Sequence, residues 1–181
     1  MEIKKKFILT IVLLSYLATA INGAIVITGL ENMAKDLDLN QSVLSWVQNS
    51  YVLAWGCFML LGGRLSDAFG RRVILNLSLL LFGIGSLFAG IATSATILIL
   101  SRFIQGVGAS ILAPTSLALI MDYFTGEERI KAIAWYSSIS GLGMCIGLVM
   151  GGTLASFLSW RYGFFIYLPL IVFMLIVSMK V

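Results

Sequence analysis

The chain has 181 residues, of which 60% are hydrophobic and only 11% are charged, and its mean hydropathy is +1.02. A water-soluble domain needs more polar surface than this composition supplies, so the sequence predicts an integral membrane protein. The net charge of +4 does not indicate a nucleic-acid partner, because the basic residues lie in the short segments between apolar runs, where they set membrane topology.

Six apolar runs predict six transmembrane helices, in one all-α domain over residues 1–181. With a rise of about 1.5 Å per residue, each run can cross a hydrocarbon core roughly 30 Å thick. The first run follows three lysines, as in a signal peptide, but its 23 residues exceed the usual apolar region of such a peptide, so we expect a retained helix. The predicted spans are residues 7–29, 43–63, 73–91, 97–121, 132–156 and 162–179.

The distribution of lysine and arginine over alternate loops predicts the orientation. One side holds nine basic residues, namely Lys4, Lys5, Lys6, Arg64, Arg71, Arg72, Arg129, Lys131 and Lys180. The other side holds two, Lys35 and Arg161. The sequence therefore predicts that both termini are cytoplasmic.

Four charges fall within ten positions in the segment GRLSDAFGRR, residues 63–72. Such a block cannot lie in hydrocarbon, so we expect a loop between the second and third spans.

Arg102 is the one basic residue placed inside a span. It lies seven positions after Ala95, about 10 Å below the membrane surface, where a charge must face protein or water or snorkel to the interface. Asn22 lies seven positions before Gly29 on the first span and reaches a similar depth. We expect Arg102 to face the bundle interior beside Asn22, with Gln105 one turn along.

Small residues recur every four positions on the fifth span, at Gly143, Gly147, Gly151 and Ala155. Such a stripe allows another helix backbone to approach closely.

Cys57 and Cys145 lie within apolar runs and are expected in the core. With no CxxC pair and no histidine, neither a disulfide framework nor a metal site is predicted.

These motifs resemble the major facilitator superfamily, and within it the fourteen-helix drug:proton antiporters. GRLSDAFGRR is similar to the family signature G-x-L-x-D-x-x-G-R-R, and LSRFIQGVGAS, residues 100–110, to its R-x-x-Q-G-x-G-A motif. GMCIGLVMGG, residues 143–152, resembles the antiporter motif G-x-x-x-G-P-x-x-G-G, with Leu148 in place of the proline. WVQNSYVLAWG and WRYGFFIYLP resemble the family's second and sixth helices, so the resemblance covers nearly the whole chain.

The resemblance implies functional roles for three groups of residues. A cytoplasmic gate would comprise Gly63, Asp67, Gly70, Arg71, Arg72 and Asp122. Transport and proton coupling would involve Arg102, Gln105 and Asn22. The helix 5 antiporter motif would comprise Gly143, Gly147, Gly151 and Gly152. The gate and the helix 5 glycine face are expected to dock onto a second half of the transporter.

Two departures bear on mechanism. Asn22 stands where these antiporters usually carry an aspartate, and asparagine cannot titrate. The chain also has six predicted spans where the family has two six-helix halves, so we expect an amino-terminal half of a longer protein, or a protein that works as a homodimer.

The resemblance thus implies a proton-coupled exporter of drug-like amphipathic compounds in the bacterial cytoplasmic membrane. Its expected partners are a small-molecule substrate, protons, the lipid bilayer, and a carboxy-terminal half or a second copy. A transporter of another solute and a non-transporting six-helix remnant or partner protein are the alternatives. An enzyme is not expected, because no intramembrane pair of carboxylates is available for acid and base work. No cofactor and no catalytic residue are predicted.

Overall fold

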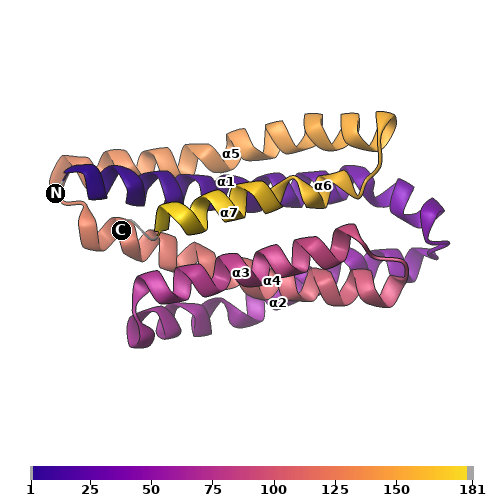
Figure 1. The fold of residues 1–181 in the computed structure, drawn as a ribbon, viewed down its shortest axis with the longest axis horizontal. Helices are drawn as coiled ribbons and strands as arrows, with labels where there is room; N and C mark the ends of the chain where they lie inside the picture. Colours follow the sequence, from indigo (N-terminus) through magenta and orange to yellow (C-terminus); the bar gives the residue numbers. More distant parts are fainter. Residues whose placement is uncertain (1, 179–181) are drawn as a thin grey trace.

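The computed structural model describes residues 2–178 as a bundle of α-helices joined by short turns, with no β-strand in this range. The helices are α1 (Glu2–Asp36), α2 (Gln41–Phe69), α3 (Arg71–Gly90), α4 (Ala95–Tyr123), α5 (Gly126–Phe157), α6 (Tyr162–Phe165) and α7 (Tyr167–Ser178). The helix pairs that pack along the greatest length are α2 with α4, α3 with α4, and α1 with α5. α1 also packs on α4, which joins these pairs into one bundle (Figure 1).

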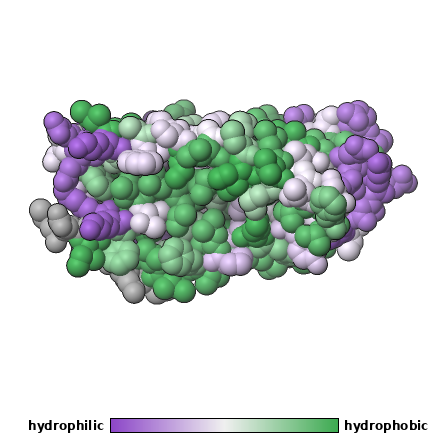
Figure 2. Space-filling model, turned by 90° about the horizontal axis from the view of Figure 1, so that it is seen from above, coloured by the Kyte–Doolittle hydropathy of each residue, from purple (hydrophilic) through white to green (hydrophobic). Residues whose placement is uncertain are grey.

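Five described helices, α1 to α5, are long and apolar enough to cross a membrane, and a shorter apolar stretch covers Tyr162–Ser178. The surface carries an apolar belt between two polar ends (Figure 2). The chain is therefore a multi-pass membrane protein. α1 begins and α7 ends toward the same end of the bundle (Figure 1). The cytoplasmic location of this end stays a prediction, and so does the number of six spans.

The charged segment at residues 63–72 is mostly helical, so the predicted loop is wrong. α2 continues through Phe69, and only Gly70 separates it from α3. Gly70 has φ of 92°, a conformation that a residue with a side chain rarely adopts, and this ends the helix. An apolar run marks where a helix lies in hydrocarbon, but backbone hydrogen bonding continues into water beyond it. For the same reason, α1, α4 and α5 extend beyond their predicted apolar limits.

The sixth predicted span consists of two helices, α6 and α7, separated by Ile166. Pro169 lies in the first turn of α7, where a missing backbone N–H costs no helical hydrogen bond. The break therefore lies where proline is tolerated. Residue 179 of the predicted span, and Lys180 of the charge count, lie outside the described residues.

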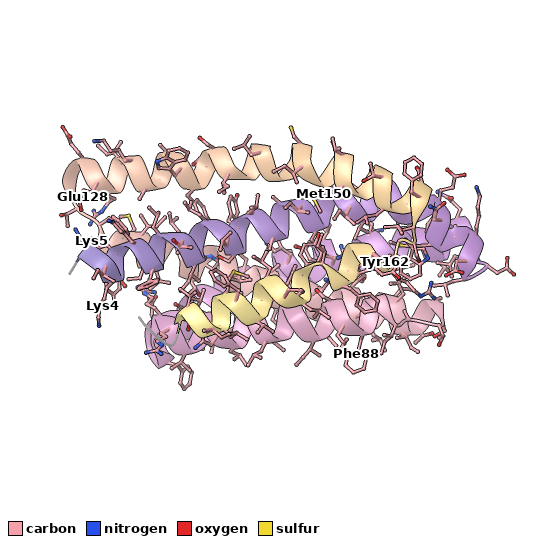
Figure 3. The ribbon with its side chains drawn as sticks, turned by 45° about the horizontal axis from the view of Figure 1, so that its top comes forward. Lys4, Lys5, Phe88, Glu128, Met150 and Tyr162 are labelled. Atoms are coloured by element: carbon pink, nitrogen blue, oxygen red, sulfur yellow. The ribbon has the colours of Figure 1, made fainter. Side chains whose placement is uncertain are left out.

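α1 and α5 lie side by side along most of their length (Figures 1 and 3). At their polar end the Nζ atom of Lys5 donates to a carboxylate oxygen of Glu128 at 2.6 Å. Farther along, the rings of Tyr16 and Tyr136 stack with their centroids 4.1 Å apart.

Candidate functional site

Arg102 on α4 is fully buried, with 0% of its surface exposed, as are Asn22 on α1 and Gln105. Arg102 Nη1 donates to Asn22 Oδ1 and to Gln105 Oε1, each at 2.7 Å. The prediction that Arg102 faces the bundle interior beside these two residues is confirmed. Its side chain does not snorkel.

Two residues of α2 also contact the guanidinium. Its Nε atom donates to the backbone carbonyl of Val47 at 3.3 Å, and its Cζ atom lies 4.2 Å from the centre of the Tyr51 ring. The electron-rich face of an aromatic ring attracts a cation, and this attraction strengthens when water is excluded. Three oxygen atoms and a ring thus surround this cation, and none of them carries a formal charge.

Gln105 extends the cluster to α3. Its Nε2 atom donates to Ser86 Oγ at 2.7 Å, and Ser86 Oγ donates to the carbonyl of Phe82 at 2.8 Å. The cluster therefore connects α1, α2, α3 and α4. Ser86 and Tyr51 were not predicted, because single polar side chains in apolar runs form no periodic pattern.

A second polar cluster lies at the end of the bundle that holds the segment 63–72. Arg71 Nη1 donates to the carboxylate of Asp67 and Arg71 Nε to Asp122 Oδ2 at 3.0 Å. Ser66 Oγ lies 3.4 Å from the same Nη1. The prediction that Asp122 is a partner of Arg71 is confirmed. α2, α3 and α4 are joined here by one guanidinium.

The other predicted gate residues lie around this ion-pair cluster. Gly63 packs near Pro114, since a Cβ atom added to it would lie 3.9 Å from the proline ring. Gly70 and Arg72 line a surface hollow of about 440 Å³ together with Arg71 and Asp122. The six predicted gate residues therefore lie in the last two turns of α2, at the α2–α3 junction and at the adjoining ends of α3 and α4.

The glycine stripe of α5 packs on α1 of the same chain. A Cβ atom added at Gly143 would lie 2.8 Å from Ala20 Cβ, and one at Gly147 would lie 2.7 Å from Ala24 Cβ. One at Gly151 would lie 2.8 Å from the Cα atom of Ile25. The expectation that this face docks onto a second half is wrong for these three glycines. Gly152 differs, because a Cβ atom there would meet nothing within 4 Å.

Comparison with known proteins gives the family. The family model for the Major Facilitator Superfamily matches residues 12–181 of this chain. The chain belongs to this superfamily.

Several superfamily relatives are named for drug resistance or export. The puromycin resistance protein pur8 of Streptomyces alboniger is 41% identical over 162 residues, 89% of this chain and 32% of the relative. The multidrug transporter protein MdtP of Bacillus subtilis is 32% identical over 166 residues, 92% of this chain and 30% of the relative. The chain thus spans about a third of the length of these relatives.

A solved superfamily structure, that of the proton:xylose symporter XylE, has a TM-score of 0.82 and 18% identity, and covers 97% of this chain and 44% of its own. At this identity the likeness shows the fold. The superfamily and its solved neighbours are transporters and not enzymes. Within residues 2–178 no three His, Cys, Asp or Glu side chains are grouped to hold a metal ion.

A third polar cluster, not predicted, lies at the opposite end of this superfamily bundle. Arg161 Nη1 donates to the carboxylate of Asp36, and its Nη2 donates to the carbonyl of Ala92 at 2.7 Å. Trp160 Nε1 donates to the same carboxylate at 3.2 Å, and the Arg161 guanidinium lies over the Trp160 ring. This outer clamp, as we call Asp36, Ala92, Trp160 and Arg161, joins the end of α1 to two loops. The sequence does indicate this cluster, because Arg161 is one of only two basic residues on the predicted outer side of the membrane.

Proposed function

We propose that the chain is the amino-terminal six-helix half, residues 1–181, of a proton-coupled exporter of drug-like amphipathic compounds. Support for export comes from relatives named as puromycin resistance and multidrug transporter proteins. The superfamily membership makes membrane transport the activity to test first.

The observation that carries this proposal is the buried Arg102 cluster. A guanidinium inside a membrane bundle costs free energy that a purely structural helix would avoid, and intramembrane charges therefore mark functional sites. Arg102 contacts α1 and α2 as well as residues of its own helix, so a shift of either helix changes its hydrogen bonds. In the proposed mechanism, protonation elsewhere in the complete transporter alters this cluster and thereby the relative positions of α1, α2 and α4.

The Arg71 ion pairs would act as the cytoplasmic gate. Arg71, Asp67 and Asp122 lie at the helix ends near the basic residues that predict the cytoplasmic side. Because these pairs are partly exposed to water, they can be broken and remade at modest cost, as an alternating gate requires. Both chain termini would then lie in the cytoplasm of the producing bacterium.

A second six-helix unit is part of the proposal. Superfamily transporters place the substrate between two helical units near the middle of the membrane, and one unit provides a single wall of that site. The second unit would be a carboxy-terminal half or a second copy of this chain. Protons and a small-molecule substrate would bind between the two.

The test is energised efflux from bacteria that lack other exporters. Cells making the exporter that contains these residues should lose a preloaded fluorescent amphipathic dye, and an uncoupler should stop the loss. Arg102→Ala should reduce uncoupler-sensitive efflux at least tenfold while the protein still inserts in the membrane. The side chain of Lys131 is 76% exposed, so the control substitution Lys131→Ala should leave efflux unchanged.

Two results would contradict the proposal. Efflux that continues in the presence of the uncoupler would contradict proton coupling. Full efflux by the Arg102→Ala variant would contradict a role of the buried cluster in transport.

A further inference from the structure

Six buried side-chain atoms have no hydrogen-bond partner among the described residues, and we consider the three that lie at the Arg102 cluster. They are Arg102 Nη2, Asn22 Nδ2 and the Tyr167 hydroxyl. Each of the three side chains has at most 1% of its surface exposed. Buried polar groups without a partner are uncommon and each calls for an explanation, such as a ligand or an ion.

These atoms belong to neighbouring side chains. Arg102 and Asn22 are hydrogen-bonded through Arg102 Nη1 and Asn22 Oδ1. The Tyr167 hydroxyl on α7 lies beside the Asn22 side chain and close enough to Arg102 to interact electrostatically with it. Tyr167 is held in place by Phe82, whose ring meets its ring edge to face with centroids 5.8 Å apart. α1, α4 and α7 thus each bring one unpaired donor to the same region.

All three unpaired groups can donate a hydrogen bond. The guanidinium and the amide nitrogen are donors only, and the phenol can donate as well as accept. A ligand that satisfies all three must therefore offer several acceptor lone pairs. A halide ion and a carboxylate group both do so.

The charge of Arg102 points to the same chemistry. The nearest carboxylate along α1 is that of Glu31, nine residues or about 13 Å of helix from Asn22, and it is exposed and paired with Lys35. Asp122 on α4 is twenty residues or about 30 Å from Arg102. No carboxylate of the described residues neutralises this cation. A water molecule could accept from the donors but would leave the charge uncompensated.

We propose that Arg102, Asn22 and Tyr167 form a binding site for a small monovalent anion. The anion is either a free halide such as chloride or the carboxylate group of a carried organic compound. The inference deepens the role assigned to this cluster under the proposed function, but its test measures binding and does not depend on transport.

The experiment is thermal unfolding of the purified protein in detergent at constant ionic strength. Sodium chloride or sodium formate replaces sodium gluconate stepwise, because gluconate is a much larger anion than either and serves as the reference. A ligand that binds only the folded state raises the unfolding temperature with concentration. We expect the temperature to rise with at least one of the two small anions.

The matched variant is Asn22→Asp, which places a carboxylate of nearly the same size against Arg102. It should weaken the apparent anion affinity at least tenfold, because the guanidinium then has its own counter-ion. Tyr167→Phe removes one donor and should weaken it less. The exposed control Lys131→Gln should respond as the unaltered protein does.

The outcomes separate the two sources of the anion. A response to chloride supports a halide site, and a response to formate alone supports recognition of a substrate carboxylate. No response to either anion, or an equal response in Asn22→Asp, would overturn the proposal. If the anion binds but uncoupler-sensitive efflux is absent, the proposed function fails while this inference stands.

Discussion

At the scale of single residues, Arg71 shows how one side chain joins helices that are otherwise held by apolar packing. Its pair with Asp67 spans four residues across the α2–α3 junction, and its pair with Asp122 reaches α4. An exposed ion pair contributes only about 0.2–1 kcal/mol, so these pairs are weak as stabilisers. Their value lies in position, because both carboxylates bind one guanidinium at a helix junction.

We expect Asp67→Asn to slow the transport cycle with little effect on substrate affinity. The neutral amide keeps the shape of the side chain but loses the charge that attracts Arg71, so the conformation in which this pair forms becomes less populated. Alkylation rates of single cysteines placed on the two membrane faces measure that balance. Glu127→Gln, at a side chain 90% exposed, serves as the control. A large loss of affinity with an unchanged balance would contradict a gate role.

The depth of Arg102 and its partners could be predicted because helical rise converts sequence position into depth. Counting along two helices of opposite direction places Asn22 and Arg102 at a similar depth, and one helical turn places Gln105 beside Arg102. Tyr51 and Tyr167 could not be predicted in the same way, since their contacts depend on how α2 and α7 are rotated. A backbone acceptor such as the carbonyl of Val47 leaves no sequence signal at all.

At the scale of helices, the contact of α5 with α1 depends on the absence of side chains at three glycines. Sequence periodicity predicted that one face of α5 carries a small-residue stripe, but a stripe does not say which helix packs on it. The expectation of a second half rests on the resemblance to the family, and α1 has no matching glycine pattern that would indicate it as the neighbour. In the structure, Ala20 and Ala24 provide the small surface on the α1 side.

Gly147→Ala and Gly152→Ala form a matched pair that tests this packing. Both substitutions gain the same helix propensity, about 1 kcal/mol, so their difference isolates the contact. An alanine at position 147 would crowd Ala24 and the carbonyl of Ile21, whereas one at position 152 meets open space. We expect Gly147→Ala to lower the free energy of unfolding by about 1–3 kcal/mol relative to Gly152→Ala. Denaturation in mixed detergent micelles measures this difference, and equal stabilities would contradict the α1 contact.

The outer clamp makes a prediction at the same scale. Arg161 donates to Asp36 and to the carbonyl of Ala92, so it holds the α3–α4 loop against the end of α1. We expect Arg161→Gln to speed amide hydrogen exchange in the α3–α4 loop and in α6, with no change near Arg71. Lys35→Gln, which alters an exposed charge at the same end of the bundle, is the control. Unchanged exchange in the loop would show that apolar packing of Trp160 suffices.

At the scale of the whole molecule, the bundle covers its helices unequally. In the most apolar stretch of α4, 61% of the residues are buried, but in those of α2 and α5 only 17% are. Leu60 on α2 and Val149 on α5 are 84% and 70% exposed. Cys57 and Cys145 lie on these two helices and are also exposed, so the expectation that they pack in the core is wrong. Apolar neighbours in the sequence predict that a cysteine is buried only when its helix is covered on all sides.

The two exposed cysteines allow a test of what residues 1–181 do alone. Because the outward faces of α2 and α5 are apolar and uncovered within the described chain, we expect the purified 181-residue protein to self-associate in detergent as its concentration rises. A short bismaleimide should link copies through Cys57 or Cys145, and the double variant Cys57→Ser with Cys145→Ser should not be linked. The same protein should insert in membranes but give no uncoupler-sensitive dye efflux, because a single unit cannot close over a substrate. Uncoupler-sensitive efflux by the 181-residue protein would show instead that two copies make a complete transporter, and the linked cysteine would then identify the helix at their interface.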